Sequence, residues 1–507
     1  MTADRWKLSE LFEAAGLQLP ARSLNPIITS ITDDTRRIER GSLFVATTGS
    51  KVDSHLFVSD AVDKGAAAII VERETPPYRG VDIVQVADSR DALGRLAHAW
   101  YGNPSHDMLV LGVTGTNGKT TTTFILEAIL RAAGYEPGVL GTIEYRFANQ
   151  RREAANTTPS AMQLAKLFAD MRDAGVNAVA MEASSHAADQ RRISGISFDA
   201  CILTNITQDH LDYHGTMDAY ADAKKMLFFD YLLRPAGPKR KTPAAVFNLD
   251  DPYASMFASE FPQKKVTYAV DSAKADLRAT NIQMSGNETT FQLESAAGSR
   301  EVRMHLVGMF NVHNALGAIG AAQAVGVSEN SILEGLANLP AVPGRLEQVK
   351  AGQPFMVLVD YAHTPDALER VLVNSRAMTA GRLIAVFGCG GDRDNTKRPI
   401  MGKSAAELAD YVVVTNDNPR TEDPEKIADQ IMEGVTTVGL PLENVARILD
   451  RKAAIEHALE LAQAGDVVVI AGKGHEDYQI LGTEKIHFDD REVAREFLKT
   501  RSSANSS

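Results

Sequence analysis

This 507-residue chain has two cysteines, fewer basic than acidic residues (53 against 65) and few long apolar runs. Its two cysteines, Cys201 and Cys389, lie far apart without metal-ligand spacing, which excludes a disulfide framework and a cysteine zinc site. The formal net charge of −12 disfavours nucleic acid and anionic membranes as partners. No segment approaches the ~18 consecutive apolar residues of a membrane span, and the opening MTADRWKLSE lacks the apolar core of a signal peptide. We therefore expect a cytoplasmic protein.

The chain has about three times the length of a ~150-residue domain, which predicts two to four domains. Apolar strands alternate with helical patterns throughout, as expected for α/β folds with parallel sheets. Turn residues at 101–104 and 339–344 mark two breaks. Residues 265–305 alternate like an antiparallel ladder, and 235–243 form a basic, proline-rich loop. The expected strands are 42–47, 66–71, 108–113, 177–182, 198–205, 356–362, 382–388, 411–417 and 466–472.

A glycine-rich segment, GVTGTNGKT at 112–120, lies between the strand 108–113 and a helical run. In this context backbone N–H groups and the helix N-terminus favour phosphate, Lys119 adds a positive charge, and the Thr120 hydroxyl can bind magnesium. Val113 stands where the standard pattern has a glycine, so the loop is a variant. The alternative is an ordinary turn from strand to helix.

Glu182 ends one strand, and Asp209 and His210 follow the next. Both positions are expected at carboxyl ends of strands in the sheet that carries the phosphate loop, where a carboxylate and an imidazole could hold magnesium with Thr120. Each could equally be a solvated loop residue. Lys224 and Lys225 are expected by default to be a solvated pair.

Ordered motifs across nearly the whole chain resemble the Mur ligases of peptidoglycan precursor synthesis, most closely the members that add the third residue of the peptide. They are GVTGTNGKTTT (112–122), TTP (157–159), MEASSH (181–186), TNITQDHLDYH (204–214), NVHN (311–314), PGR (343–345), DYAHTP (360–365), GCGGDRD (388–394), DNPR (417–420) and GKGHEDYQ (472–479).

The resemblance implies three α/β domains: a UDP-binding N-terminal domain (1–102), a central P-loop-type parallel-sheet ATPase domain (103–342) and a C-terminal Rossmann-like domain (343–507). It implies a monomeric ATP-dependent ligase that acts on UDP-N-acetylmuramoyl-L-alanyl-D-glutamate through an acyl phosphate and releases ADP and phosphate. Such a reaction gathers negative charge at the γ-phosphate, which Lys119 and Mg²⁺ would neutralise.

The resemblance also implies roles for single residues. Thr120 and Glu182 would hold one Mg²⁺, His210 a second, and Lys224 would be carbamylated into an anionic metal ligand. The ATP site would comprise Gly115, Thr116, Asn117, Gly118, Lys119, Thr120, Thr121, Asn311, Asn314, Arg345 and Asp360. The UDP-muramoyl-dipeptide site would comprise Thr35, Ser50, Thr157, Thr158, Ser184, Gln190 and Arg192, of which Thr35 and Ser50 could be ordinary turn residues.

The DNPR form resembles the members that add meso-diaminopimelate. Diaminopimelate has a distal carboxylate that lysine lacks, and a guanidinium binds a carboxylate through two parallel hydrogen bonds. The implied amino-acid site comprises Arg393, Asp417, Asn418, Pro419, Arg420, Gly472 and Glu476. Arg420 could instead form a surface salt bridge with Glu422 or Asp423.

The sequence leaves three alternatives open. The same ligase could add L-lysine, the chain could be a ligase of the folylpolyglutamate-synthase type, or it could be a non-catalytic nucleotide-binding regulator. The DNPR segment and the N-terminal domain disfavour the second alternative, and the complete set Lys119, Thr120, Glu182, His210 and Lys224 disfavours the third.

Overall fold

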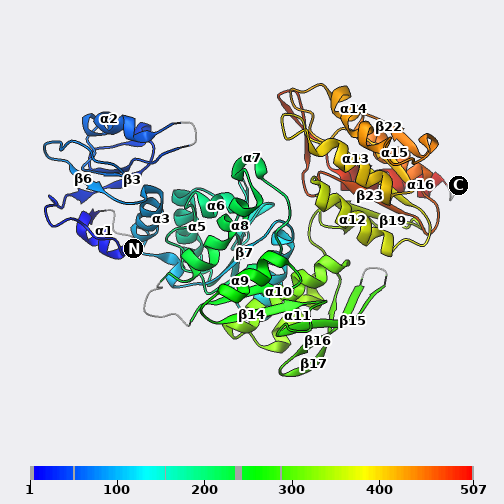
Figure 1. The fold of residues 1–507 in the computed structure, drawn as a ribbon, viewed down its shortest axis with the longest axis horizontal. Helices are drawn as coiled ribbons and strands as arrows, with labels where there is room; N and C mark the ends of the chain where they lie inside the picture. The colour runs from blue at the N-terminus through cyan, green and yellow to red at the C-terminus, as the bar shows by residue number, and fades with distance from the viewer. Residues whose placement is uncertain (1–4, 50–51, 155, 235–241, 286–287, 505–507) are drawn as a thin grey trace. The chain divides into compact units, whose positions relative to one another are not determined.

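A computed structural model describes residues 5–49, 52–154, 156–234, 242–285 and 288–504 (Figure 1). The chain divides into two compact units. The first unit contains residues 1–206, 216–277 and 314–335, and the second contains 207–215, 278–313 and 336–507. No helix in the described ranges combines the length and the apolar character needed to cross a membrane.

The N-terminal part of the first unit is a four-stranded parallel sheet in the order β3-β4-β5-β6. One of its cores contains residues of α1 and α3, and the other contains residues of α2. The elements are β1 (Trp6–Lys7), α1 (Leu8–Ala14), β2 (Ile27–Ile28), β3 (Ser30–Thr32), η1 (Thr35–Arg37), β4 (Ser42–Val45), η2 (Ser54–Phe57), α2 (Val58–Asp63), β5 (Ala68–Val71), β6 (Asp82–Gln85) and α3 (Ser89–Trp100). The expected strands 42–47 and 66–71 are confirmed.

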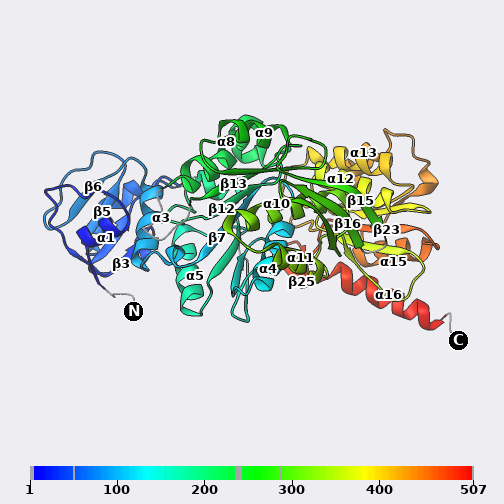
Figure 2. The same ribbon diagram turned by 90° about the horizontal axis from the view of Figure 1, so that it is seen from below.

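The rest of the first unit is built on a larger sheet in the order β10-β9-β8-β11-β7-β12-β13-β14. The parallel strands of this sheet are β7, β8, β11, β12, β13 and β14. Figure 2 shows β7, β12 and β13 side by side. The strands are β7 (Leu109–Thr114), β8 (Pro137–Leu140), β9 (Glu144–Phe147), β10 (Gln150–Glu153), β11 (Ala178–Glu182), β12 (Ala200–Leu203), β13 (Ala244–Asn248) and β14 (Lys265–Ala269).

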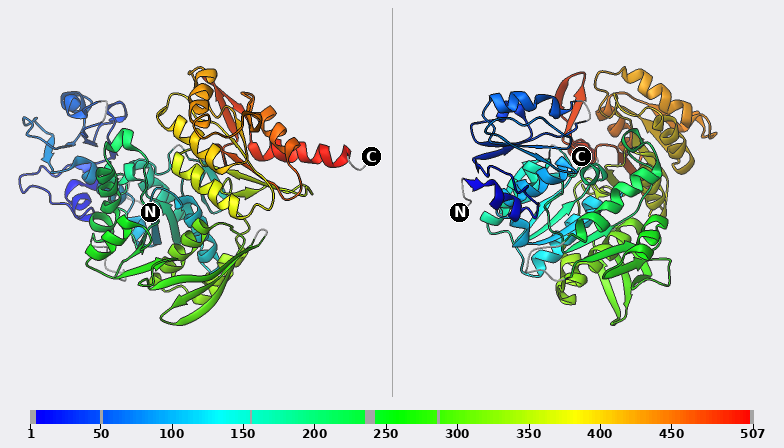
Figure 3. Two further views of the ribbon diagram at one scale, coloured as in Figure 1. Left: turned by 45° about the vertical axis from the view of Figure 1, so that its right-hand side comes forward. Right: turned by 60° about the vertical axis from the view of Figure 1, so that its left-hand side comes forward.

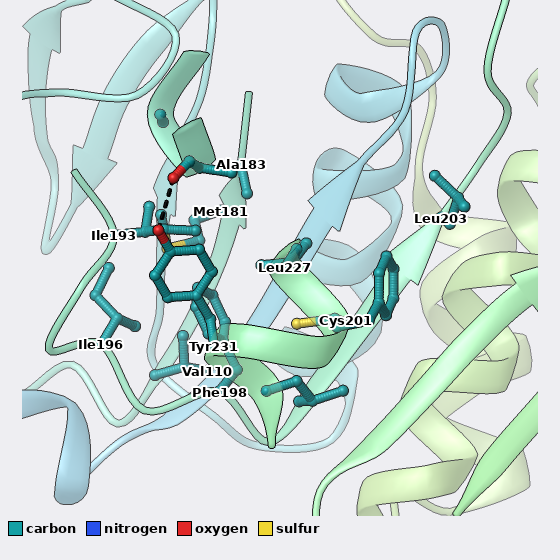
Figure 4. Close-up of a cluster of buried hydrophobic side chains, with 14 of the residues drawn as sticks. Val110, Met181, Ala183, Ile193, Ile196, Phe198, Cys201, Leu203, Leu227 and Tyr231 are labelled. Atoms are coloured by element: carbon teal, nitrogen blue, oxygen red, sulfur yellow. Dashed lines mark hydrogen bonds between the residues drawn. The ribbon is translucent and has the colours of Figure 1, made fainter. Parts of the chain in front are cut away.

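The helical elements of this part connect the parallel strands. They are η3 (Pro104–His106), α4 (Lys119–Ala132), α5 (Ala161–Asp173), α6 (Ser185–Asp189), α8 (Met217–Met226), the π-helix η4 (Leu227–Leu232) and α9 (Pro252–Glu260). Residues 314–335 contribute most of α10 (Met309–Val325) and α11 (Glu329–Asn338). Figure 4 shows part of the core, where the Tyr231 hydroxyl donates to Ala188 O at 2.6 Å.

The expected antiparallel ladder over 265–305 is wrong in its first segment. Strand β14 pairs in parallel with β13, whereas β15 (Leu277–Ser285), β16 (Glu288–Ser295) and β17 (Gly298–Met304) form the antiparallel part, the long green strands at the bottom of the left-hand view in Figure 3. Alternation reports that one face of a strand is buried, and both kinds of pairing produce it.

The second unit is built on a six-stranded sheet in the order β18-β19-β23-β20-β21-β22, in which only β18 is antiparallel among the described strands. Apolar residues of α12, α13 and α14 pack on one face, and those of α15 and α16 on the other, and Figure 2 shows α12 and α13 across β23 from α15 and α16. A hairpin, β24 (Tyr478–Leu481) and β25 (Glu484–His487), follows β23.

The expected strands 356–362, 382–388, 411–417 and 466–472 each contain one shorter strand, β19, β20, β21 and β23, whereas β18 and β22 were not expected. The strands are β18 (Glu347–Gln348), β19 (Met356–Asp360), β20 (Leu383–Phe387), β21 (Tyr411–Val414), β22 (Val445–Arg447) and β23 (Val467–Ala471). The helices are α7 (Leu211–His214), α12 (Pro365–Ala377), α13 (Lys397–Leu408), α14 (Pro424–Val435), η5 (Leu442–Asn444), α15 (Arg451–Leu461) and α16 (Asp490–Ala504).

Within the first unit, α3 packs directly on the larger sheet domain. The Asp88 carboxylate accepts from Arg191 Nε at 3.0 Å, and Asp91 accepts from Ser194 Oγ at 2.7 Å. A Cβ on Gly94 would lie 2.6 Å from Ser194 O, so the helix approaches this segment closely because position 94 has no side chain. An ion pair, a hydrogen bond and close packing therefore join the four-stranded sheet domain to the larger sheet domain.

Candidate functional site

The phosphate loop has the predicted context of strand, turn and helix. Strand β7 ends at Thr114, the loop turns through Gly115 (φ 146°) and Gly118 (φ 89°), and α4 begins at Lys119. A Cβ on Gly115 would overlap Thr204 Oγ1, and one on Gly118 would overlap Asn314 Oδ1. Both positions therefore require glycine for their backbone conformation and for space.

Lys119 and Asn205, which lies just after β12, hold this loop through hydrogen bonds. Lys119 Nζ donates to Gly115 O at 2.8 Å and to Thr116 O at 2.7 Å. The backbone N–H of Thr116 donates to Asn205 O at 2.8 Å, and that of Asn117 to Asn205 Oδ1 at 3.1 Å. Further along the chain, Thr121 is buried at the start of α4.

Glu182 lies at the carboxyl end of β11, beside β7, as the sequence predicts. The residue is 1% exposed, and its Oε1 accepts from Thr120 Oγ1 at 3.0 Å. Thr142, in the segment after β8, donates to the same carboxylate through its backbone N–H (2.9 Å to Oε1) and its hydroxyl (3.0 Å to Oε2). The Thr120 hydroxyl and the Glu182 carboxylate are thus in contact next to the phosphate loop.

Five residues expected to bind the muramoyl-dipeptide gather next to this carboxylate. Thr158 Oγ1 donates to Glu182 O at 2.9 Å and lies 3.4 Å from Ser184 Oγ, and Arg192 Nη1 donates to Thr158 O at 3.0 Å. Arg192 also donates to Gln190 Oε1 at 2.6 Å. The fifth, Thr157, lies 3.1 Å from Thr142, hydroxyl to hydroxyl.

The other two residues of this group lie near the N-terminal sheet. Thr35 begins the short helix η1, and its carbonyl accepts from Lys64 Nζ at 3.1 Å. Ser50 falls outside the described residues. The structure therefore brings together five of the seven residues expected to bind the muramoyl-dipeptide, and Thr35 stands apart from these five.

Lys224 is not a solvated residue, so that default expectation is wrong. Its side chain is 1% exposed, Nζ donates to Gly115 O at 2.8 Å, and the ammonium lies 4.3 Å from the centre of the Tyr220 ring. Lys225, on the adjacent position of α8, reaches Glu260 instead. Two neighbouring residues of a helix point in different directions, so Lys224 can be buried while Lys225 reaches Glu260. The sequence of α8 alone does not show which of the two lysines is buried.

Asn314 lies against Gly118 in the first unit, whereas Asn311, Arg345, Asp360 and His210 belong to the second. Asn311 Nδ2 donates to Val307 O at 2.8 Å, and Arg345 stacks on the Tyr361 ring at 4.7 Å. The buried Asp360 carboxylate accepts from the backbone N–H groups of Leu346 and Ala362. Burial raises the pKa of Asp360, with Arg345 acting against the rise. His210, at φ 54°, occupies the N-cap position of α7, and its backbone N–H donates to Asp209 Oδ1 at 2.8 Å.

The residues expected to bind the third amino acid meet at the carboxyl ends of β21 and β23. Asn418 Nδ2 donates to Glu476 Oε2 at 3.0 Å. A Cβ on Gly472 would lie 2.5 Å from Asp417 Oδ2, a buried oxygen with no hydrogen-bond partner among the described residues. The structure therefore provides an acceptor, Asp417 Oδ2, beside a glycine that leaves room next to it.

The two arginines of this group both lie near Gly390. A Cβ there would lie 3.0 Å from Arg420 Nη1 and 3.8 Å from Arg393 Cγ. Arg420 Nη1 donates to Gly391 O at 2.8 Å. The alternative ion pair with Glu422 or Asp423 is wrong, because Glu422 binds Arg398 and Asp423 caps α14. Pro419 precedes Arg420, and its carbonyl accepts from the Glu422 N–H.

Sequence reasoning missed Lys473 and Thr142. Lys473 is fully buried, and its Nζ contacts Asn418 Oδ1 at 3.1 Å and Glu476 Oε2 at 3.2 Å. It lies inside the GKGHE segment, so its position next to Gly472 was a usable signal. Thr142 has no such signal, because a single threonine after a strand belongs to no recognisable pattern.

Three family models match the chain in order: the Mur ligase family catalytic domain at 27–101, the Mur ligase middle domain at 113–322 and the Mur ligase glutamate ligase domain at 344–474. The chain is 44% identical over 477 residues to UDP-N-acetylmuramoyl-L-alanyl-D-glutamate–2,6-diaminopimelate ligase of Bacillus cereus, which covers 94% of this chain and 95% of the relative. The protein of the same name from Geobacillus kaustophilus is 46% identical, covering 94% and 96%.

A solved structure of a UDP-N-acetylmuramoyl-L-alanyl-D-glutamate–2,6-diaminopimelate ligase is 34% identical, with a TM-score of 0.71, over 99% of this chain and 100% of the other. The likeness spans the N-terminal, central and C-terminal parts together, so the predicted three-domain α/β architecture is confirmed. This chain belongs to the Mur ligase family.

Proposed function

We propose that this chain is an ATP-dependent ligase that adds meso-diaminopimelate to UDP-N-acetylmuramoyl-L-alanyl-D-glutamate. The observation that carries the proposal is an identity of 44% and 46%, over 94% of the chain, to relatives named as 2,6-diaminopimelate ligases. The clusters around Glu182 and around Asn418 support it, because each offers the donors and acceptors that one half of the reaction needs.

We propose domain boundaries at 1–102, 103–342 and 343–507. The three family models, which match 27–101, 113–322 and 344–474, each fall within one of these ranges. A monomer is proposed as the assembly. The cytoplasm is proposed as the location, because a ligase that consumes ATP needs the compartment that supplies it.

The first half of the reaction forms an acyl phosphate. An oxygen of the terminal D-glutamyl carboxylate forms a bond to the γ-phosphorus while the bond from that phosphorus to the bridging oxygen breaks and ADP leaves. The loop 115–118, the start of α4 and the Lys119 ammonium would stabilise the negative charge on the phosphoryl oxygens. Asn314, next to Gly118, would contact the nucleotide together with Asn311, Arg345 and Asp360.

The residues at the loop fit a magnesium ion. Magnesium is usually held by one or two carboxylates with phosphate oxygens and waters rather than by a full protein cage. Thr120 and Glu182 supply a buried hydroxyl and a buried carboxylate 3.0 Å apart, and no group of three His, Cys, Asp or Glu ligands occurs in the described part of the chain. Thr120 and Glu182 would hold one ion and His210 a second. The ions would neutralise the phosphoryl charge.

Lys224 would supply a further oxygen ligand if carbamylated. Its burial next to Gly115 O places the amine at the loop, where an anionic carbamate would favour a cation and an ammonium would oppose one. Full activity of Lys224→Ala, with no stimulation by bicarbonate, would contradict this role.

The dipeptide would bind along Thr157, Thr158, Ser184, Gln190 and Arg192, with Thr35 and Ser50 toward the uridine diphosphate. Arg192 is held by Gln190 and Thr158, so its guanidinium is oriented before the substrate carboxylate arrives. The second half of the reaction then follows. The amine nitrogen of diaminopimelate forms the amide bond, the acyl carbon–oxygen bond to phosphate breaks, and phosphate leaves with the proton that the nitrogen loses.

The amino-acid site would recognise a zwitterionic far end. Arg420 and Arg393 would bind carboxylates. Glu476 and Asp417 Oδ2 would accept hydrogen bonds from an ammonium, for which Gly472 leaves space. Asn418 and Pro419 would line the site between the carboxylates and the ammonium. Lysine lacks the distal carboxylate, so it would leave a guanidinium without its partner.

The deciding experiment measures phosphate release from ATP by the full chain. Release that requires both UDP-muramoyl-dipeptide and meso-diaminopimelate is expected, with L-lysine at least a hundredfold poorer in kcat/KM. Equal rates of phosphate release with L-lysine and with meso-diaminopimelate would contradict the proposed selectivity for diaminopimelate. No release with either amino acid would favour the non-catalytic regulator.

A further inference from the structure

Thr142 contacts both oxygens of the Glu182 carboxylate, although no part of the proposed reaction uses it. Its backbone N–H donates to Oε1 at 2.9 Å and its hydroxyl donates to Oε2 at 3.0 Å. Thr120 Oγ1 donates to the same Oε1 at 3.0 Å. The carboxylate is therefore held in one orientation, from β8 on one side and from α4 on the other.

The approach of this segment depends on its neighbour Gly141. A Cβ at position 141 would overlap Glu182 Oε1. The chain after β8 thus passes directly against the carboxylate, and the backbone N–H of Thr142 reaches it because residue 141 has no side chain. The contact is a feature of the backbone path as well as of the threonine side chain.

The Thr142 hydroxyl also contacts Thr157, whose Oγ1 lies 3.1 Å away. A hydroxyl carries one hydrogen and can accept more than one bond. Since Thr142 donates its hydrogen to Glu182, the Thr157 hydroxyl must be the donor in the second contact. A directed row of hydrogen bonds therefore runs from Thr157 through Thr142 to Glu182.

We propose that Thr142 is a positioning residue that couples the dipeptide end of the site to its phosphate end. The inference rests on the proposed function for the roles of Glu182 and Thr157. A dipeptide that engages Thr157 changes the partner of the Thr142 hydroxyl, and that hydroxyl orients the Glu182 oxygens available to a cation. Binding of dipeptide and of magnesium nucleotide should therefore reinforce each other through this one side chain.

The test replaces Thr142 by valine, which keeps the shape and the backbone N–H but removes the hydroxyl, and by serine, which restores the hydroxyl. Calorimetric affinity for UDP-muramoyl-dipeptide is measured with and without a non-hydrolysable magnesium nucleotide. In Thr142→Val we expect the reinforcement to be lost and the magnesium activation constant to rise about tenfold, as for loss of a hydrogen bond to a charged group. Thr142→Ser should restore both quantities.

Thr289→Val is the matched control, because Thr289 is a buried threonine whose hydroxyl has no partner among the described residues. It should leave both quantities unchanged. A Thr142→Val protein with wild-type reinforcement and wild-type magnesium dependence would overturn the inference, even if its thermal stability falls. Failure of the wild-type chain to bind UDP-muramoyl-dipeptide would instead count against the proposed function, so the two failures are distinguishable.

Discussion

Arg420 has a backbone conformation that is rare for a residue with a side chain, with φ at 53°. The hairpin that follows β23 stabilises it: the Arg420 N–H donates to Ile480 O at 3.2 Å, and its carbonyl accepts from the Gly482 N–H at 2.9 Å. With Nη1 fixed on Gly391 O, the guanidinium is oriented by the chain around it. Such fixed geometry suits recognition of a carboxylate by a planar fork of donors.

Replacing Arg420 by alanine should raise the KM for meso-diaminopimelate at least tenfold and leave the KM for ATP unchanged. Lysine at this position should not restore the affinity, because an ammonium cannot form two parallel hydrogen bonds. Steady-state kinetics with each substrate varied in turn checks this. Arg447→Ala, which removes an arginine paired with Glu425 and Asp429, is the control, and an unchanged diaminopimelate KM in Arg420→Ala would contradict the assignment.

His98 is fully buried on α3, and neither ring nitrogen has a hydrogen-bond partner among the described residues. Burial lowers its pKa from an ordinary 6.5 to about 3. The folded chain therefore keeps the ring neutral while the unfolded chain takes up a proton below pH 6.5. The contribution of His98 to the free energy of unfolding is therefore full above pH 6.5. It falls by about 1.4 kcal/mol per pH unit as the pH drops from 6.5 toward 3.

His98→Leu should therefore flatten the decrease of the melting temperature between pH 6.5 and pH 5. The measurement is thermal denaturation across that range for both proteins. The exposed His305, replaced by glutamine, is the control and should leave the slope as it is. A slope in His98→Leu equal to that of the wild type would show that His98 does not set the acid sensitivity.

At the scale of elements, the phosphate loop is the segment whose geometry depends most on single residues. Gly115→Ala adds both backbone strain and an overlap with Thr204 Oγ1. We expect kcat/KM for ATP to fall at least a hundredfold while the far-ultraviolet circular dichroism stays the same, since the loss is local. Gly134 follows α4 at φ 79°, and a Cβ there would meet nothing within 4 Å, so Gly134→Ala tests strain alone and should retain activity.

The elements themselves were largely predictable, and so were the site residues that end strands. Glu182 and the 417–420 segment could be placed because parallel strands bring their carboxyl ends to one edge. Lys224 could not be placed, because its burial depends on packing between α8 and the loop rather than on the pattern of α8. Thr142 was invisible for the same reason: its partners, Glu182 and Thr157, are 40 and 15 positions away.

At the scale of the whole molecule, the second unit depends on a buried ion pair. Arg451 and Asp490, both with fully buried side chains, pair at 2.7 Å, and Arg451 also donates to Asn416 O and Ala471 O. The arginine thereby connects the chain after β21 to the last residue of β23, next to the proposed amino-acid site. Removing one partner of a buried pair leaves the other charge without compensation.

Asp490→Asn should destabilise the second unit by about 3–5 kcal/mol. Thermal denaturation followed by calorimetry should show a transition at lower temperature for this unit, and the affinity for diaminopimelate should fall before unfolding begins. Asp429→Asn, at an exposed position on α14, is the matched control. Equal melting profiles for Asp490→Asn and the wild type would contradict the importance of the pair.

The two cysteines give each unit a natural reporter of its own opening. Cys201 lies in β12 of the first unit and Cys389 follows β20 in the second, and both are unpaired and buried. Burial raises the pKa of both thiols, that of Cys389 to about 12, and only the exposed thiolate reacts with disulfide reagents. In the unmodified chain, two labelling rates therefore measure two opening free energies, and each substrate can be assigned to the unit whose thiol it protects.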